Sequence, residues 1–406
     1  MLGMDLVREQ RDMIETTRRF AREVVAPVAG ELDRAERPED CFSWEIVEKA
    51  HAAGIRTATL SDEYGGSGID SLTTAIVVEE LARADLGVSV ILAQTLKIAQ
   101  TLESAANSNQ RERFLPAYAA DPRGLLAIGI TEPDTGSNYI IPHPAGRFRT
   151  RAARTAGGWV INGQKHFISN GNRARLYLLF AQTDTGGSLV DASTCFLVER
   201  DTPGFSIGQI HDKMGERLVN NAELVFEDCF VPDENVLGEI GGGFDVLARF
   251  FPASNAYAAA SVLGVAQAGY DRALEWCANR FQGGTYLIEH DSIAQTLARM
   301  RMLIDASRAY IHRAAWMADH RDQGWDPTMG ALPKVFASEA AWEVVTLTLE
   351  LHGGYGYMRE MGIAKLVRDA AAFLHSDGAN AALLLKAARF IRQDAPVPTR
   401  RLTDNR

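Results

Sequence analysis

The stretch GWVINGQKHFISNG, residues 158–171, alternates short apolar runs with two Asn-Gly pairs. Asn-Gly accepts the positive φ angles of a tight turn, so the pairs at 162–163 and 170–171 predict β-hairpins. Further short apolar runs extend the strand series at residues 176–180, 194–198 and 222–226. In the last of these runs, Leu224 and Phe226 alternate with acidic residues, as in a half-buried strand. A central β domain is therefore predicted over residues 125–240.

Helical periodicity flanks this β segment on both sides. On the N-terminal side, apolar residues recur at three- and four-residue steps at 13–24, 44–50 and 75–81, and Pro27 predicts the end of the first helix. On the C-terminal side, long helices are predicted at 293–304, 335–351 and 379–391.

Paired glycines at 283–284 and 353–354 divide the C-terminal helices into a bundle of about four. The predicted fold is therefore α+β with three domains. These are an N-terminal α-helical domain (1–124), a central β-barrel or sandwich domain (125–240) and a C-terminal four-helix bundle (241–406).

Charge and composition exclude several classes of protein. The 406 residues include 42 Lys plus Arg and 52 Asp plus Glu, and 42 − 52 gives a net charge of −10. Binding to nucleic acid or to anionic lipid needs a positive field, so no nucleic-acid partner and no membrane partner are expected. No apolar run is long enough to span a bilayer, since stretches such as 89–102 are interrupted by Gln94, Lys97 and Gln100. The N-terminus has no uninterrupted apolar segment typical of a signal peptide. A cytoplasmic protein is expected.

The cysteines predict neither a disulfide framework nor a metal site. Four are spread along the chain without a CxxC pair, at positions 41, 195, 229 and 277. We expect buried free thiols and no bound metal.

The loop ITEPDTGSN, residues 130–138, directly follows the apolar run 126–130. It offers hydroxyl groups and backbone N–H groups around Gly136, which suit the polar edge of a flat ligand. Taken alone, the stretch is more typical of a plain Pro/Gly turn.

In order along essentially the whole chain, these motifs resemble the acyl-CoA dehydrogenase family of flavoproteins. The family signature comprises a TEP-x-x-GSD loop, an ING-x-K-x-W-I-T-NG segment, a GGYG stretch and an RDA-to-EGT segment. The matching stretches here are TEPDTGS (131–137), INGQKHFISNG (161–171), HGGYG (352–356) and RDA (368–370). The resemblance implies an FAD-dependent enzyme that desaturates the α,β-bond of an acyl thioester, on CoA or on a carrier protein.

The resemblance also implies which residues meet the flavin ring between the β domain and the bundle. Ile130 and Thr131 match residues at the pyrimidine side of the ring. Phe167 stands where the family usually has a Trp packed on the flavin, with Ile168 beside it. Ser169 replaces a Thr and keeps the hydroxyl that approaches flavin N5.

A second set matches residues that reach the dinucleotide across a subunit interface, and so implies a homotetramer. Arg280 matches an Arg at the FAD pyrophosphate, although a surface salt bridge is the ordinary interpretation of a single Arg. Leu351, Gly353 and Gly354 match backbone that approaches the same dinucleotide. Paired glycines allow a close main-chain approach to a phosphate, and Arg supplies charge. The family's common Phe and Gln are replaced nearby, at Gly283 and Asp291.

The catalytic base departs from the family pattern. Counting from Arg368, Asp377 takes the position of the usual Glu, and the alternative base position matches Ser254, which has no carboxylate. Asp is shorter than Glu by about 1.5 Å, and an error of about 1 Å at a reacting centre can cost about 100-fold in rate. The competing interpretation is that Asp377 only caps a helix beginning near Asn380 and that activity is lost.

Substrate contacts follow from the same resemblance. Ser137 would contact the thioester arm, with Ser254 and Gly378 also at the substrate. Asn138 replaces an Asp and Asn255 replaces an Arg near the acyl or pantetheine path of relatives, so a standard CoA thioester is not implied by these positions. The two histidines within the motifs, His166 and His352, are expected to hydrogen-bond loop backbone.

Two alternative functions stay open. Nitroalkane oxidases of the same superfamily use an Asp in an Asp-Gly-x-Asn context, matched at 377–380, and place a Ser where Ser254 falls, but Leu384 replaces the Arg that assists their Asp. A non-catalytic flavoprotein resembling the DNA-binding members is disfavoured by the net charge of −10. For the dehydrogenase, the implied electron acceptor is an electron-transfer flavoprotein.

Overall fold

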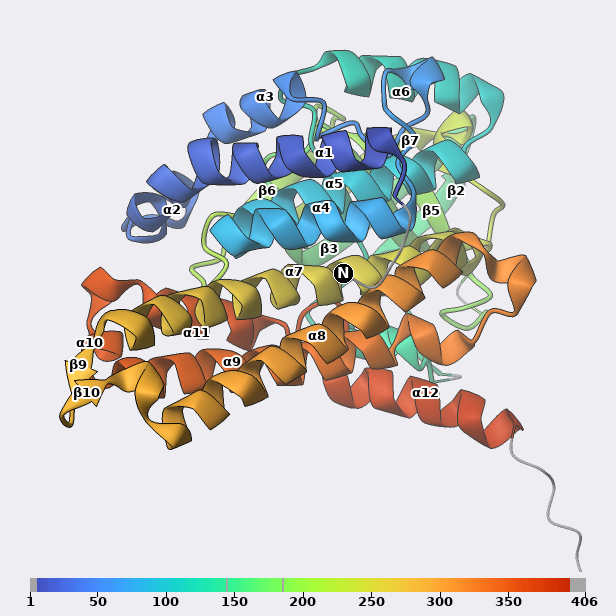
Figure 1. Ribbon diagram of the computed structural model, residues 1–406. Coiled ribbons are helices and arrows are strands. Elements are labelled where there is room, and N and C mark those ends of the chain that lie inside the picture. The colour runs from blue at the N-terminus through green and yellow to red at the C-terminus, as the bar shows by residue number, and fades with distance from the viewer. Residues whose placement is uncertain (1–5, 144, 185, 395–406) are drawn as a thin grey trace, which may run out of the picture.

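The computed structural model describes residues 6–143, 145–184 and 186–394, apart from the side chain of Asn138. Helices come first, a β-sheet follows and helices return (Figure 1). The predicted fold class is confirmed. The sheet begins at Leu126 and the long helix after it begins at Gly243. The domain boundaries at 124/125 and 240/241 stay predictions.

Six α-helices lie in the described N-terminal region and include those predicted at 13–24, 44–50 and 75–81, with one difference. They are α1 (Arg8–Phe20), α2 (Ala26–Asp33), α3 (Trp44–Ala52), α4 (Ser71–Ala84), α5 (Leu86–Ala105) and α6 (Ser108–Ala120). The prediction that the first helix ends at Pro27 is wrong, because a π-helical turn at Ala21–Val25 leads directly into α2. Pro27 lies in the first turn of α2, where its missing N–H removes no helical hydrogen bond.

The central region is one eight-stranded sheet. Its strands are β1 (Leu126–Gly129), β2 (Arg151–Thr155), β3 (Gly158–Ser169), β4 (Leu176–Gln182), β5 (Ser193–Glu199), β6 (Phe205–Ile210), β7 (Asn221–Pro232) and β8 (Val236–Leu237). They pair in the order β6-β7-β3-β2-β4-β5-β8, and β1 pairs in parallel with β4. Leu224 and Phe226 are buried, as the alternation in β7 predicts.

The predicted hairpin at Asn162-Gly163 is wrong. Strand β3 runs through both residues, and its register against β7 shifts there, which marks a β-bulge. The side chain of Asn162 accepts a hydrogen bond from the backbone N–H of Asp228 (2.8 Å). A Cβ atom at Gly163 would lie 2.5 Å from the Cα of Thr150, so glycine permits this close approach. The tight turn before β3 is instead at residues 156–157, between β2 and β3.

The C-terminal helices are α7 (Gly243–Asn279), α8 (Asp291–Asp319), α9 (Leu332–His352), α10 (Gly354–Tyr357), α11 (Ile363–Ala372) and α12 (Asn380–Asp394). The predicted glycine breaks are confirmed. Gly283 and Gly284 form the turn of a small hairpin, β9 (Phe281–Gln282) with β10 (Thr285–Tyr286), and Gly353 ends α9 with φ +55°.

The two helical regions share one hydrophobic core. Helix α4 packs along α7, as Figure 1 shows, and side chains of both regions belong to the same buried cluster. The sheet has its own cluster, which includes Trp159, Tyr177 and Phe196. Within the part of the chain that the structure describes, no helix has the length and apolarity needed to cross a bilayer. The four cysteines are buried free thiols.

Candidate functional site

A cavity of about 800 Å³ lies where the β1 and β3 motifs meet α5, α7 and the loop after α11. Nine of the residues expected at flavin or substrate line it, from segments far apart in the sequence. They are Ile130, Thr131, Ser137, Phe167, Ile168, Ser169, Ser254, Asp377 and Gly378.

A buried ion pair holds two of the sequence motifs together at this cavity. Lys165 Nζ lies 2.8 Å from Glu132 Oε1 and donates to the carbonyl of Ile130 (3.1 Å). The Glu132 carboxylate also accepts from the backbone N–H groups of Arg149 (2.6 Å) and Thr150 (3.0 Å). The pair therefore joins the 130–137 loop to β3, a role that the sequence interpretation missed.

The environment of this pair shifts both pKa values. Burial opposes ionisation of Glu132, but Lys165 and the hydrogen bonds outweigh it, so the pKa of Glu132 is lowered. Burial lowers the pKa of Lys165 to about 8, although Glu132 acts against the shift. Because the carboxylate is stabilised as an anion, the pair is ionised at neutral pH.

Phe167 presents an aromatic ring to solvent at the cavity mouth. Its φ is +58°, a left-handed conformation that is rare for a bulky residue, and 58% of its surface is exposed. Asn221 donates to the carbonyl of Phe167 (2.9 Å) and to the hydroxyl of Ser169 (3.3 Å), which holds this backbone in place. Strained backbone of this kind is concentrated at functional sites.

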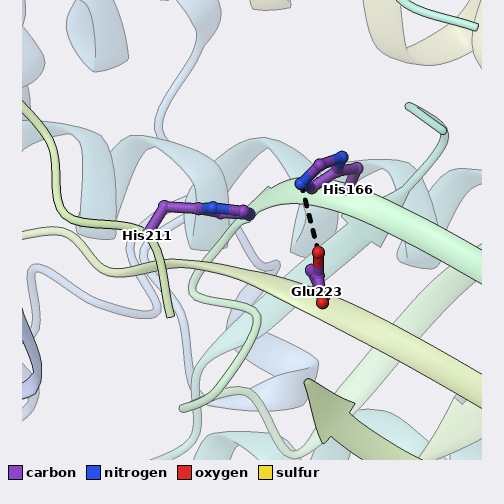
Figure 2. A group of neighbouring side chains, drawn as sticks. All are labelled: His166, His211 and Glu223. Carbon is purple, nitrogen blue, oxygen red and sulfur yellow. Dashed lines mark ion pairs between the residues drawn. The ribbon is translucent and has the colours of Figure 1, made fainter. Parts of the chain in front are cut away.

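The side chains of His166, His211 and Glu223 form one polar group (Figure 2). His166 Nε2 is 3.3 Å from Glu223 Oε1, so the expectation that the His166 side chain hydrogen-bonds loop backbone is wrong. Its ring stacks on Phe167 at 4.1 Å between centroids, and the His211 ring packs against both. Burial, reinforced by His166, lowers the pKa of His211 and favours its neutral form. We interpret the group as a polar support for the Phe167 ring.

The loop that carries Asp377 is tied down on both sides. Ser137 Oγ accepts a hydrogen bond from the N–H of Ala379 (2.9 Å). Buried Lys334 donates to the carbonyl of Gly378 (2.7 Å) and to the side chain of Asn380 (3.0 Å). Asp377 itself has φ +49°, and such strain in a non-glycine residue needs this surrounding support.

The Asp377 carboxylate faces a buried cation. Its Oδ2 lies 3.4 Å from Nζ of Lys97, which also donates to Ser254 Oγ (3.2 Å). The ion pair directs the Asp377 carboxylate toward the cavity wall formed by α5. The sequence interpretation noted Lys97 only as a break in an apolar stretch.

The cavity holds another carboxylate that sequence reasoning missed. Glu216 is buried, and burial raises its pKa. Its carboxylate lies 3.4 Å from Nζ of Lys213, and its backbone N–H donates to Asp369 (2.8 Å). Glu216 is thus paired to a lysine on its own loop, and the negative charge of Asp377 also contributes to its raised pKa.

The two asparagines that depart from the family pattern have different outcomes. Asn255 lines the cavity and its side chain donates to the carbonyl of Gly330. The side chain of Asn138 lies outside the described part of the chain.

The remaining predicted cofactor residues line a second cavity, of about 960 Å³, at one end of the helical domain. Figure 1 shows β9, β10 and α10 together at this end. Arg280, Leu351, Gly353 and Gly354 line the cavity, and the Arg280 guanidinium lies over the rings of Trp276 (5.6 Å) and Tyr355 (5.3 Å).

The chemistry of the two cavities fits the two halves of FAD. The first offers an exposed aromatic face and a hydroxyl for a flat ring. In the second, a Cβ atom built on Gly353 or Gly354 would have no other atom within 4 Å, so the backbone of both residues faces open space. Arg280 lines the same cavity, and a bare backbone beside a guanidinium suits a phosphate group. Gly283 lines this cavity, whereas Asp291 does not. His352 hydrogen-bonds backbone, as expected, but at a helical carbonyl, that of Thr348 (2.7 Å).

Three family models for acyl-CoA dehydrogenases match successive stretches of the chain. The N-terminal domain model matches residues 8–121, the middle domain model 127–229 and the C-terminal domain model 241–391. The chain belongs to the acyl-CoA dehydrogenase family. It is therefore an FAD-dependent oxidoreductase that acts on CH–CH groups.

Individual relatives agree with this assignment. The chain is 33% identical to a short-chain specific acyl-CoA dehydrogenase of Clostridium acetobutylicum, over 91% of this chain and 94% of the relative. Butyryl-CoA dehydrogenase of Megasphaera elsdenii superposes with a TM-score of 0.88 at 32% identity, covering 96% of this chain and 100% of that one.

Two further solved structures are similar. A chain from a structure described as an electron transferring flavoprotein of Acidaminococcus fermentans is 30% identical, with a TM-score of 0.88 and coverage of 97% and 100%. An FAD complex of PigA is 25% identical, with a TM-score of 0.86 and coverage of 97% and 100%.

Proposed function

We propose that this family member desaturates an acyl thioester, on CoA or on a carrier protein, with Asp377 as the catalytic base. The observation that supports this most directly is the position of the Asp377 carboxylate. It lies in the cavity with Ser169 and Thr131, and Ser254 at the alternative base position has no carboxylate.

In the proposed reaction, Asp377 takes the proton from the α-carbon, next to the thioester carbonyl. The β-carbon loses a hydride, and the electron pair of the α C–H bond becomes the new Cα=Cβ bond. FAD, when bound, supplies the hydride acceptor at N5. Lys97 holds the base in place. Ser137 ties the loop of Asp377 to the β1 motif through the N–H of Ala379, and Lys334 holds the same loop through the carbonyl of Gly378. Positioning of this kind accounts for much of an enzyme's rate enhancement.

A direct test is anaerobic titration of the purified FAD enzyme with a panel of acyl-CoAs, acyl-carrier proteins and nitroethane. We expect an acyl thioester to reduce the flavin quickly, seen as bleaching of its visible absorbance, and nitroethane to reduce it poorly. We also expect slow reoxidation by oxygen while the unsaturated product stays bound. Fast reduction by nitroethane with none by any thioester would overturn the dehydrogenase assignment.

Nitroalkane oxidation is the second candidate. It is favoured by the Asp-Gly-x-Asn context of Asp377 and by Ser254. Leu384 argues against it, because it replaces an Arg that assists the Asp, is 46% exposed and does not line the cavity of Asp377.

We further propose a homotetramer in which Arg280, Leu351, Gly353 and Gly354 of one subunit reach the FAD of another. The separation of these residues from the Phe167 cavity, into a cavity of their own, supports this arrangement. An electron-transfer flavoprotein is the proposed electron acceptor. The exposed Phe167 ring beside the cavity, and the similarity to the Acidaminococcus fermentans chain, support that choice.

Arg280→Ala should weaken FAD binding and loosen the tetramer together, because the variant loses the cation beside the open glycine backbone. FAD content per chain and size-exclusion chromatography with light scattering measure the two effects. Arg301→Ala is the matched control, since Arg301 is an exposed arginine on α8 that pairs with Asp305 (2.7 Å). Full flavin occupancy in Arg280→Ala would contradict the proposed cofactor position.

Ser169→Val should keep the fold but change the flavin spectrum and slow flavin reduction. The hydroxyl would otherwise face N5, and loss of one such hydrogen bond leaves a polar atom unpaired at a cost of about 1 to 3 kcal/mol. Stopped-flow absorbance measures the rate, and Ser169→Thr is the control that keeps a hydroxyl. If Ser169→Val has both an unchanged spectrum and an unchanged rate, the position assigned to Ser169 is wrong.

A further inference from the structure

Helix α5 presents one polar face to the substrate cavity. Val90, Gln94 and Lys97 follow one another at helical spacing, and all line the cavity. Gln94 is 8% exposed and Lys97 is 3% exposed, so both polar groups are withdrawn from bulk water. A plain alkyl chain needs neither group in its binding site.

The hydrogen-bonding capacity of this face is only partly used. Among the described residues, the buried Oε1 of Gln94 has no hydrogen-bond partner. Lys97 Nζ has three donors, and its polar contacts are Ser254 Oγ at 3.2 Å and Asp377 Oδ2 at 3.4 Å, both long for an ammonium group. Buried polar groups in native proteins nearly always have partners, so the unpaired amide oxygen at this cavity wall is available to a polar group of a ligand.

The reaction itself increases the need for such a group. When Asp377 takes the α-proton it becomes neutral, and buried Lys97 then loses the negative charge of its ion-pair partner. An oxygen atom of the substrate that accepts a hydrogen bond from Lys97 would keep the ammonium solvated through this step. An aliphatic chain offers no such atom.

We propose that Gln94 and Lys97 form a subsite for an oxygen-bearing group on the acyl chain. The inference rests on the proposed function and narrows it, because the substrate becomes an acyl thioester with a hydroxyl or a carboxylate on the chain. A hydroxyl accepts from Lys97 and donates to Gln94 Oε1. A carboxylate accepts from Lys97 and, with the amide rotated, from Gln94 Nε2.

The test compares three CoA thioesters of equal chain length: valeryl-CoA, 5-hydroxyvaleryl-CoA and glutaryl-CoA. Anaerobic stopped-flow measures the rate of flavin reduction, and spectral titration of the bound flavin measures the dissociation constant. The compared quantity is the rate of flavin reduction divided by the dissociation constant. With the unmodified enzyme, we expect this ratio to be at least about tenfold higher for one of the oxygen-bearing thioesters than for valeryl-CoA, because a site that hydrogen-bonds a substrate oxygen discriminates against an analogue without it. Comparison of 5-hydroxyvaleryl-CoA with glutaryl-CoA shows whether the subsite binds a hydroxyl or a carboxylate.

Variants decide whether Gln94 and Lys97 cause the preference. Gln94→Leu and Lys97→Met should each reduce the ratio of oxygen-bearing to plain substrate at least about tenfold, and Lys97→Arg should keep part of it. Lys49→Met, which removes an exposed lysine on α3, is the control and should keep the ratio. Because Gln94→Leu removes no charge, it tests the subsite even if Lys97→Met does not fold.

The possible failures are distinguishable. If no thioester reduces the flavin, the proposed function is wrong. If valeryl-CoA reduces it as well as both oxygen-bearing thioesters, and the variants change all three rates equally, the subsite is wrong while the dehydrogenase assignment stands.

Discussion

Asp377→Asn is expected to leave FAD bound but to lower the rate of flavin reduction by an acyl thioester about 100- to 10,000-fold, the usual scale for a positioned general base. The physical reason is that an amide cannot take the α-proton, although its oxygen still accepts a hydrogen bond from Lys97. The loop should stay in place, because Ser137 and Lys334 hold it through Ala379, Gly378 and Asn380 and make no use of the Asp377 side chain. Stopped-flow reduction under anaerobic conditions measures the effect.

Asp377→Glu is the companion variant. The longer side chain reaches the position common in the family, so we expect partial activity with a shifted chain-length preference. Full activity in Asp377→Asn would remove Asp377 from the mechanism. A loss of FAD in the same variant would show that the residue is structural.

Lys165→Met is expected to lower the free energy of unfolding by about 3 to 5 kcal/mol, because it leaves the Glu132 carboxylate buried without its cation. Urea unfolding followed by circular dichroism measures the change. Lys49→Met is the matched control, since the ion pair of Lys49 with Glu45 is exposed to solvent and should contribute little to stability.

The same pair predicts a dependence of stability on pH. The pKa of Glu132 is lowered in the folded state, so its contribution is present above the ordinary carboxyl pKa and is lost as the pH falls through the folded value. The variant should therefore differ most from the unmodified protein near neutral pH and least in acid. Equal stability of Lys165→Met and Lys49→Met at pH 7 would contradict this account of the pair.

Local patterns in the sequence were sufficient for the order of helices and strands and for the family. In helices such as α8 and α9, apolar residues recur at helical spacing because one side of the helix faces the core. Strands β4, β5 and β7 coincide with continuous or alternating apolar runs in the sequence. The motifs also located most of the cavity, because Thr131, Phe167, Ser169 and Asp377 all line it. These features depend on residues close together in the chain, so a single sequence contains them.

Features that depend on contacts between distant segments were decided by the tertiary structure. The Asn162-Gly163 pair has turn chemistry, but the approach of Thr150 and the hydrogen bond from Asp228 make it a bulge inside β3. Pro27 likewise does not end its helix, because it follows a π-helical turn and lies in the first turn of α2.

Lys97 is the clearest case. It lies 157 residues before Ser254 and 280 residues before Asp377, yet its ammonium group contacts both. Along the sequence it only interrupts an apolar helix, and an interrupted helix is usually polar on a solvent face. The polar face points inward only because α5 packs against α7 and the loop of Asp377. Partners that are more than 150 residues apart in the sequence are brought together by the folded core, and local periodicity carries no information about them.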